Sequence, residues 1–239
     1  MTNEPATPNA GERYLDGAYL AHNPGWHAEH SPTKARWIDD FLRRNRMEPR
    51  SIAEVGCGSG EILVELKKRR PDALFTGFEI SPQAYAICSG KQAPGLEFRL
   101  DDLLRSNAER FDLLLAIDVF EHVPDYLGFL RALRDRAEHQ LFHIPLDLSV
   151  QALARGTSYP ILRDQTGHLH YFFKDTALAT LRDCGYEIVD WTYTRSSQEL
   201  PGKSLRTKFA NLPRKLMQLF SEDLSARIFG GYSLLVLTR

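Results

Sequence analysis

The chain has 239 residues, of which 43% are hydrophobic and 26% charged, and its formal net charge is -1. This length and composition predict one α/β domain with a sizeable core and some appended segments. A net charge so close to zero excludes a whole-protein field that would attract nucleic acid, although local patches remain open.

Cysteine usage and hydropathy indicate the compartment. The three cysteines, Cys57, Cys88 and Cys184, are far apart and show no CxxC spacing. This pattern is typical of free thiols in a reducing compartment and not of a disulfide framework or a zinc site. No apolar run approaches the roughly 20 residues that cross a bilayer, and residues 1–10 are too polar for a signal peptide. We therefore expect a cytoplasmic protein without a membrane span.

The N-terminal region divides into two parts. Residues 1–12 have the composition of a disordered segment. Residues 14–30 are rich in aromatic and histidine side chains without a helical or strand period. Two interpretations stay open: a surface segment pinned by its aromatic rings, or a lid whose rings exclude water from a ligand. We treat 1–30 as a disordered N-terminus with an aromatic lid segment. A single domain over 31–239 follows, and its first helix starts at Ser31 and Pro32.

The most informative stretch is 51–60. A short apolar run that carries Glu54 is followed by glycines at alternate positions, Gly56, Gly58 and Gly60, and a helical pattern begins at once. This order predicts a strand, a tight turn and a helix N-terminus. The glycines allow positive φ and leave no Cβ between the backbone and a ligand. The helix start adds unpaired N–H groups and a positive dipole end.

The spacing of these glycines separates two classes of ligand. A dinucleotide-binding turn has the pattern GxGxxG, which would require a third glycine at position 61. Position 61 is Glu61, whose charge would repel a pyrophosphate. Glu54, just before the turn, suits instead a ligand with a positively charged end.

Two further strands end in carboxylates. The run 74–79 ends at Glu79, which lies 23 positions after Gly56 and so close to the spacing at which an acid reaches ribose hydroxyls. The alternating run 96–100 is closed by Asp101, Asp102 and Leu103. Both aspartates are candidates for a contact beyond this strand, and the pattern favours Asp102.

The fourth predicted strand, 111–117, is the most apolar and therefore suits the centre of a parallel sheet. It leads directly into 118–125, a segment with acids and a histidine. Ligands of open α/β sheets bind beyond the carboxyl ends of the strands, so the reaction should take place here. A helix over 126–138 and a fifth strand over 140–145 are expected next.

Two segments interrupt the alternation of strands and helices. Residues 146–170 form the first, which ends in His168 and His170 and is expected to build an acceptor pocket. A helix over 174–184 and a strand over 186–193 follow. The second, 195–229, is basic and carries apolar residues at helical spacing. We interpret it as a helix that covers the last strands with its apolar face and leaves a solvated polar face. Peripheral membrane contact through 203–229 stays open. The run 232–237 is the last predicted strand.

With these elements placed, the chain resembles the class I S-adenosylmethionine (SAM) dependent methyltransferases over 31–239. The resemblance rests on Glu54-x-Gly56-x-Gly58-x-Gly60, Glu79, Asp102 and the run 118–123. Within that class it is most similar to the small-molecule group that includes the ubiquinone-type O-methyltransferases. It implies a doubly wound, Rossmann-like α/β fold with helices on both faces of a seven-stranded, mostly parallel sheet. The implied strand order is 3-2-1-4-5-7-6, with the last strand antiparallel.

The resemblance also implies how SAM is bound. Glu54 would lie near the amino-acid end of the cofactor, Glu79 at the ribose, and Asp102 at the exocyclic amine of adenine. The full predicted cofactor-binding set is Glu54, Gly56, Cys57, Gly58, Gly60, Glu79, Ile80, Asp102, Leu103 and Asp118.

The methyl acceptor is expected to be a small molecule that is methylated on a hydroxyl oxygen. A hydroxyl needs a base because its pKa is far above neutrality, and imidazole suits that role. His122, His143, His168 and His170 are candidates, among which we choose His170 and His122 as catalytic. An amine acceptor would need no such base.

One constellation supports a different function. Asp118-x-x-Glu121-His122, with His168-x-His170, is similar to the metal-binding set of small-RNA 3′-end 2′-O-methyltransferases. Carboxylates and imidazoles of this kind hold Mg²⁺ or Mn²⁺. Asp118 is one methylene shorter than the glutamate of that set, and we do not assign a metal. A metal-dependent RNA 2′-O-methyltransferase and a non-catalytic SAM-binding protein remain the alternatives, although nucleic acid is disfavoured by the net charge. The oligomeric state is left open.

Overall fold

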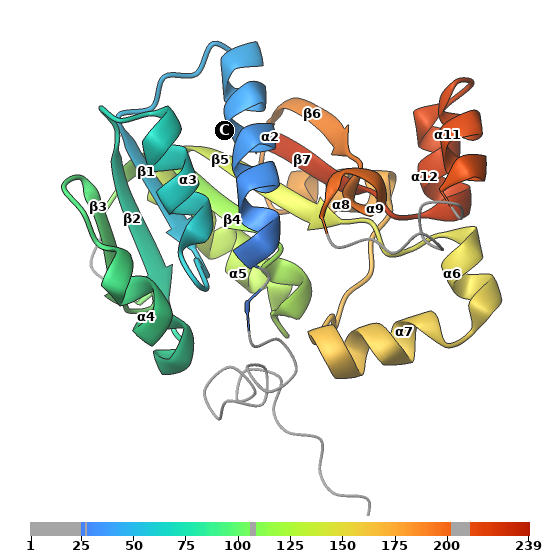
Figure 1. Cartoon of the computed structure of the whole chain (residues 1–239), viewed down its shortest axis with the longest axis horizontal. Helices are drawn as coiled ribbons and strands as arrows, with labels where there is room; N and C mark the ends of the chain where they lie inside the picture. The colour runs from blue at the N-terminus through green and yellow to red at the C-terminus, as the bar shows by residue number, and fades with distance from the viewer. Residues whose placement is uncertain (1–24, 27, 106–108, 202–210) are drawn as a thin grey trace, which may run out of the picture.

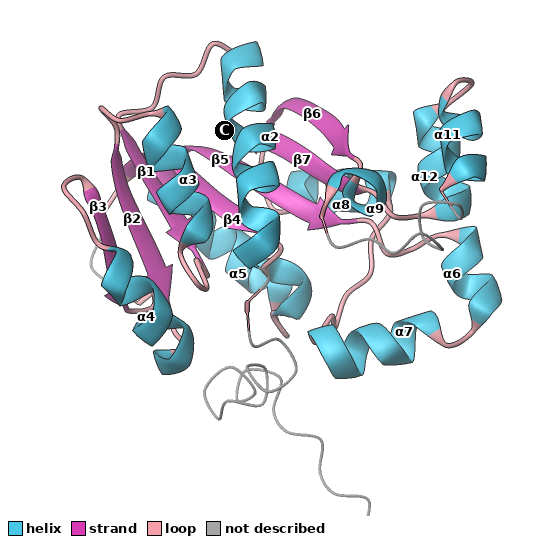
Figure 2. Cartoon of the chain, viewed as in Figure 1, coloured by secondary structure: helices cyan, strands magenta, loops and turns pink. Residues whose placement is uncertain are grey.

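The fold is built on one seven-stranded sheet of order β3-β2-β1-β4-β5-β7-β6, which confirms the predicted order (Figures 1 and 2). The computed structural model describes residues 25–26, 28–105, 109–201 and 211–239. The predicted disordered residues and most of the predicted lid lie outside this part. The strands are β1 (Ser51–Val55), β2 (Leu74–Glu79), β3 (Leu96–Leu100), β4 (Phe111–Ile117), β5 (Ala137–Pro145), β6 (Ile188–Thr194) and β7 (Ser233–Thr238).

Strand direction sets the position of the ligand crevice. The first five strands pair in parallel, and β7 is antiparallel to both of its neighbours, β5 and β6. The order of strands reverses between β1 and β4. At such a switch point the connections leave to opposite sides, so a crevice opens beyond the carboxyl ends of the strands.

Helices cover both faces of the sheet, as expected (Figure 1). The helices α2 (Ser31–Arg44), α3 (Glu61–Arg69) and α4 (Pro82–Cys88) pack on one face, and α5 (Tyr126–Leu133) and α8 (Lys174–Asp183) pack on the other. In β4, Leu113 and Leu115 face the first group, whereas Leu114 faces the second. Because successive strand residues point to opposite faces, a strand buried on both sides must be apolar at every position.

The connection into β5 differs from the prediction. The helix expected over 126–138 ends at Leu133, a single 3-10 turn η5 (Arg134–Arg136) follows, and β5 begins at Ala137. Ala137 is buried and pairs with Phe111 at the start of β4, so the ladder extends to the full length of its neighbour. The Gln140 side-chain amide donates to the carbonyls of Arg134 and Ala137, which stabilises this early entry into the strand.

Short helices occupy the two segments that interrupt the alternation. The first carries α6 (Val150–Arg155), α7 (Ser158–Ile161) and the π-helical turn η6 (Leu162–Thr166). The second carries α9 (Ser196–Glu199), α11 (Leu212–Gln218) and α12 (Glu222–Phe229). Single 3-10 turns elsewhere in the described part of the chain are η2 (Ala28–His30), η3 (Ser89–Lys91) and η4 (Phe120–His122). No helix in the described ranges is long and apolar enough to span a bilayer.

The predicted orientation of the basic helix is wrong. In α11, the apolar residues Leu212 and Leu216 are exposed, and so are Leu219 and Phe220 just after it. The inward side of α11 is polar: Arg214 donates to the carbonyls of Phe229 and Gly230 at the end of α12. A helix end leaves carbonyls without intrahelical partners. The guanidinium of Arg214 satisfies them, and this pairing decides which face of α11 turns inward.

The glycine turn packs directly against the hydrophobic core, so a larger residue in the turn tests this part of the fold. Gly60 has φ +77°, and an added Cβ would lie 2.6 Å from the Phe98 ring and 2.8 Å from Cβ of Cys88. Left-handed backbone costs a non-glycine residue about 1–2 kcal/mol before any clash. We therefore expect Gly60→Ala to lower the melting temperature of the SAM-free protein by roughly 5 °C or more, measured by circular dichroism.

Gly90→Ala is the matched control, because no atom lies within 4 Å of its added Cβ and its φ is not positive. The control should melt close to the wild-type temperature. Equal melting of the wild type and Gly60→Ala would contradict this account of the turn.

Candidate active site

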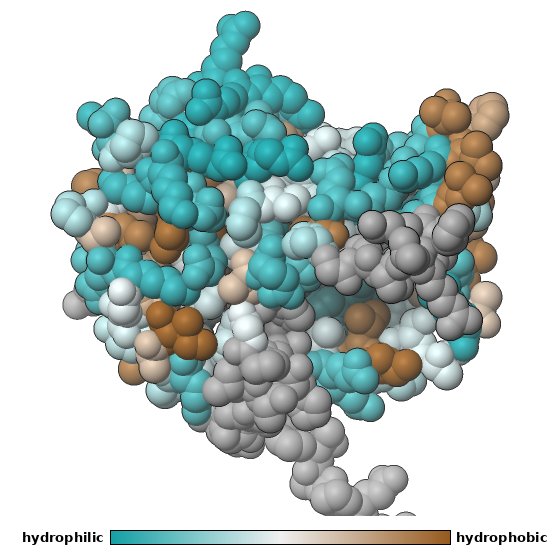
Figure 3. Space-filling model, viewed as in Figure 1, coloured by the Kyte–Doolittle hydropathy of each residue, from teal (hydrophilic) through white to brown (hydrophobic). Residues whose placement is uncertain are grey.

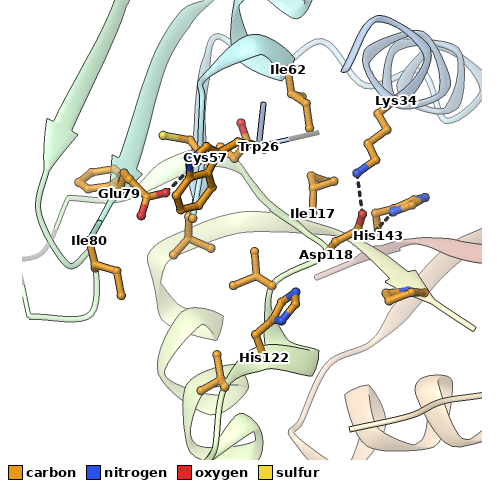
Figure 4. Close-up of a pocket in the computed structure, with 18 of the residues that line it drawn as sticks. Trp26, Lys34, Cys57, Ile62, Glu79, Ile80, Ile117, Asp118, His122 and His143 are labelled. Atoms are coloured by element: carbon orange, nitrogen blue, oxygen red, sulfur yellow. Dashed lines mark hydrogen bonds and ion pairs between the residues drawn. The ribbon is translucent and has the colours of Figure 1, made fainter. Parts of the chain in front are cut away.

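A large cavity lies at the switch point of the sheet. Its volume is about 770 Å³, within the range typical of small-molecule sites. Most residues of the predicted cofactor set line it, and so does His122 (Figure 4). Gly60 and His170 are not among the lining residues. The lining members of the two predicted sets are Glu54, Gly56, Cys57, Gly58, Glu79, Ile80, Asp102, Leu103, Asp118 and His122.

The floor of the cavity is the turn between β1 and α3. Gly56, Gly58 and Gly60 all have positive φ. The N–H groups of Gly56 and Cys57 donate to the carbonyl of Phe78, which fastens the turn to β2. An added Cβ at Gly58 would lie 3.5 Å from the Trp26 ring, so this indole covers the turn. Trp26 belongs to the predicted lid segment and is one of its few described residues.

Glu79 lies at the end of β2, where the sequence predicts an acid for the ribose. Its two carboxylate oxygens accept from the N–H groups of Gly58 and Ser81, each at 2.8 Å. These bonds fix the side chain, and each oxygen keeps lone-pair capacity for a further donor. Burial raises the pKa of Glu79, while the backbone donors act in the opposite direction.

The next part of the wall combines apolar surface with one aspartate. Asp102 lines the cavity, but Asp101 does not. Asp102 accepts from the N–H of Leu104, and a neighbouring Arg105 lies 3.3 Å from its other oxygen. Ile80 is half exposed, so it offers apolar surface beside the polar groups. This geometry fits a flat heteroaromatic ring with an exocyclic donor.

Glu54 carries a buried polar atom that a ligand could satisfy. It is only 2% exposed, and its Oε2 has no hydrogen-bond partner among the described residues. Burial raises the pKa of the Glu54 carboxyl well above its usual range, against the opposing charge of Lys34. A buried oxygen without a partner is costly, so a ligand that brings an ammonium to it would be bound firmly. The amino-acid end of SAM has such a group.

A chain of polar contacts forms the opposite wall. Lys34 of α2 donates to Asp118 at 2.6 Å, and Nδ1 of His143 lies 2.5 Å from the other oxygen of Asp118 (Figure 4). Nε2 of His143 lies 2.9 Å from the hydroxyl of Thr194. Burial alone would raise the pKa of Asp118, but His143 and Lys34 together hold it well below its usual range. Asp118 also has φ +54°, a conformation that non-glycine residues rarely adopt.

The histidines of the acceptor side occupy three different environments. Nδ1 of His168 lies 2.6 Å from Asp147, and His168 lines the cavity. The ring of His122 lies edge-on to that of His168, with 4.8 Å between centroids. Nε2 of His170 instead lies 3.0 Å from the carbonyl oxygen of Val123, and the ring of His170 packs on Tyr126. Of our two chosen histidines, therefore, only His122 reaches the cavity.

Part of the predicted metal-ligand set is brought together. In the described ranges, ligand atoms of Glu121, His122 and His168 all lie within 4.8 Å of one another. Glu121 is fully buried, neither of its oxygens has a hydrogen-bond partner among the described residues, and burial raises its pKa well above the usual range. Asp118 and His170 are not in this group. A carboxylate and two imidazoles are ligands that a divalent cation can use. Without a cation, burial favours the protonated carboxyl of Glu121.

Sequence reasoning missed three of these residues. Lys34 and Thr194 lie 84 and 51 positions from their respective partners, Asp118 and His143, and Asp147 lies 21 positions before His168. None of them stands in a recognisable motif. Tertiary contacts bring Lys34 of α2 and Thr194 of β6 to the site, and the course of the segment after β5 brings Asp147 to His168.

The strand order, the glycine turn and the carboxylates define the chain as a class I SAM-dependent methyltransferase. It belongs to the family described as "Methyltransferase domain", which matches residues 27–190.

Curated relatives share part of this region. The chain is 30% identical over 108 residues to the ubiquinone biosynthesis O-methyltransferase of Pseudomonas syringae pv. tomato, which covers 43% of the chain and 44% of the relative. It is 22% identical over 175 residues to the enzyme of the same name from Acinetobacter baylyi, covering 68% and 73%. The chain thus spans less than half the length of the relatives it matches first.

Solved structures share the fold. The plantazolicin methyltransferase BpumL, crystallised with a desmethylated plantazolicin analogue and S-adenosylhomocysteine, has a TM-score of 0.57 at 18% identity, with 96% of this chain and 91% of BpumL covered. A methyltransferase from Haloferax volcanii, in complex with the activator Trm112, has a TM-score of 0.62 at 16% identity, with 98% of each chain covered.

The carboxyl of Glu54, with its unsatisfied oxygen, gives a test of the cofactor site. A carboxyl whose pKa is raised by folding destabilises the folded protein at pH values above its unfolded pKa of about 4.3, because there the unfolded state ionises more readily. Glu54→Gln should therefore raise the melting temperature of the SAM-free protein at neutral pH by a few degrees, about 1 kcal/mol. The gain should vanish below about pH 4, where both states are protonated.

The same variant should bind SAM more than about tenfold less tightly, because a charge-assisted hydrogen bond is lost. Differential scanning fluorimetry with and without SAM measures both effects. Glu138→Gln, an exposed position of β5, is the control and should change neither. A lower melting temperature for SAM-free Glu54→Gln would refute the assignment.

Proposed function

We propose that the protein transfers the methyl group of SAM to a hydroxyl oxygen of a small-molecule acceptor. The observation that carries this proposal is the Asp147–His168 pair, of which His168 lines the cavity. The name O-methyltransferase carried by the curated relatives supports an oxygen acceptor.

The Asp147–His168 pair has the geometry of an oriented base. With Asp147 on Nδ1 of His168, the proton of the neutral ring sits on Nδ1 and Nε2 keeps its lone pair. A hydroxyl acceptor is a weak nucleophile at neutral pH, so removal of its proton by Nε2 would favour attack. SAM supplies a methyl carbon already activated by its sulfonium. We therefore assign the base to His168 instead of the predicted His170, with His122 as its neighbour.

The rest of the cavity aligns the reactants and excludes water. Glu54 and Glu79 would hold the two polar ends of the cofactor, and Asp102 its adenine. Ile117 and Val119 give an apolar wall between the glycine turn and the histidines. In an in-line displacement, alignment and exclusion of water supply much of the rate. The free state of the three cysteines agrees with a cytoplasmic location, which we propose as well.

A second candidate is metal-assisted transfer, favoured by the buried carboxylate of Glu121, which lacks hydrogen-bond partners among the described residues and lies beside His122 and His168. A divalent cation there would acidify the acceptor hydroxyl directly. RNA methylation is the version of this candidate that the sequence leaves open. A non-catalytic SAM-binding protein is the third alternative.

One assay separates these candidates. The protein is incubated with methyl-labelled SAM and either a small-molecule cell extract or size-selected RNA, each with and without EDTA. We expect label in the small-molecule pool that EDTA does not reduce. Chelator-sensitive label would assign a metal to Glu121, His122 and His168, and label in RNA would replace the proposed acceptor class. Absence of label from both pools, with intact SAM binding, would support the non-catalytic alternative.

Once an acceptor is found, His168→Gln tests the base. The glutamine keeps a polar side chain but cannot accept the proton, so kcat should fall by about 10²–10⁴-fold with SAM affinity unchanged. His170→Gln is the control and should stay within a few-fold of the wild type, since His170 faces Val123 and not the cavity. Equal losses in both variants, measured by steady-state kinetics, would contradict the role of His168.

A further inference from the structure

The helix α11 is inverted relative to the usual surface helix. Its inward side carries Arg214, bonded to the carbonyls of Phe229 and Gly230, and Gln218, bonded to the hydroxyl of Tyr232, beside the half-buried Met217. The apolar residues recur at i, i+4, i+7 and i+8, which places them on one face, and this face points away from the protein. A surface helix normally turns that face to the core, so the outward orientation indicates a partner.

The exposed apolar surface is concentrated where α11 meets α12. We call it the apolar tip, and define it by Leu212, Leu216, Leu219 and Phe220. The exposed fraction is 80% for Leu219 and 85% for Phe220, which are the highest values among the exposed large hydrophobic residues described. In Figure 3 the tip appears as a brown region over α11 and α12 at the edge of the molecule.

The helix α6 lies next to α11. The side chain of Arg214 joins the two helices, since it lies 3.4 Å from Gln151. Val150 and Leu153 of α6 are about as exposed as Leu212 and Leu216. Both segments that interrupt the alternation of strands and helices therefore carry exposed apolar side chains.

The charges beside the tip are positive. Lys215 of α11 and Arg155 of α6 are exposed, and neither has an ion pair with a described residue. The two acids in the first turn of α12 are already paired: Glu222 is bonded to Arg195, and Asp223 pairs with Lys174 and Arg227. Bases of this kind beside an apolar surface are complementary to an anionic membrane surface.

We propose that the apolar tip docks on the surface of an anionic lipid bilayer and holds the protein there as a peripheral protein. The two most exposed residues lie at the turn between two helices, a protruding shape that inserts among headgroups more readily than it matches a second rigid surface. Partition into the headgroup region needs only a few apolar side chains and nearby bases.

The docked surface is connected to the cavity. Asn211, at the start of α11, donates to the carbonyl of Ser197, and the preceding residue Ser196 lines the cavity. The start of α11 is therefore one hydrogen bond away from the part of the cavity wall to which α9 contributes. Docking itself does not depend on the proposed acceptor, so it can be tested without any methyl-transfer assay.

Vesicle flotation of the full chain tests the proposal. Phosphatidylcholine vesicles that contain roughly one quarter phosphatidylglycerol are compared with pure phosphatidylcholine vesicles at about 0.15 M salt. We expect the wild type to float with the anionic vesicles, and less of it to float at about 1 M salt. Leu219→Ser with Phe220→Ser should weaken binding by more than about tenfold, because two apolar side chains are lost from the membrane contact.

Charge and exposure are controlled separately. Arg155→Gln with Lys215→Gln should reduce binding to anionic vesicles by roughly tenfold and remove most of the salt dependence. Leu74→Ser changes another exposed leucine, at the start of β2, and should bind as the wild type does. This strand lies toward the β3 edge of the sheet, away from β7 and β6. Since all these side chains are exposed, circular dichroism should show every variant folded.

Failure of the wild type to float, or equal flotation of the wild type and the Leu219→Ser, Phe220→Ser variant, would overturn the proposal. The proposal would also be overturned if no protein floats and light scattering shows a wild-type dimer that becomes a monomer in this variant. That result would assign the tip to a second copy of the chain.

Discussion

The ion pair between Lys34 and Asp118 is the constraint on which the site depends. It ties α2 to the end of β4, and His143 and Thr194 continue the contact into β5 and β6. Asp118 is held in a left-handed conformation, and His122 of the η4 turn that follows lines the cavity. The ring of Trp37 stacks on His143 and shields this network from the other side. Without the pair, α2 would lose its polar anchor at the switch point.

The site stores unfavourable interactions that a ligand can relieve. Glu54 and Glu121 are buried carboxyls with oxygens that lack hydrogen-bond partners in the described part of the chain, and burial raises the pKa of both. Each destabilises the folded protein as long as those oxygens stay unsatisfied. Local violations of this kind gather at functional sites, where binding energy compensates for them. The same reasoning applies to α11, whose apolar face is exposed while its polar face is bonded.

Local patterns predict the parts of this protein that depend on neighbours in sequence. Alternate glycines after an apolar strand specify a left-handed turn and a helix start, and acids at strand ends must meet along one edge of a parallel sheet. The sequence alone can therefore predict that Glu54, Glu79 and Asp102 line one cavity, which they do, and the strand order follows from the resemblance. The predicted start of β5 is wrong because Ala137 is drawn into the ladder by Phe111, a contact between distant residues.

The sequence by itself determined the fold class and, through the resemblance, the cofactor, because the glycine turn and the acids at the strand ends depend on short-range backbone requirements. Only the tertiary structure decided which histidines have a carboxylate partner: His143 meets Asp118, and His168 meets Asp147 through the course of the segment between them. It also decided that α11 turns its apolar face outward. Periodicity shows that a helix has two faces, but the partners of Arg214 at the end of α12 determine which of them is buried.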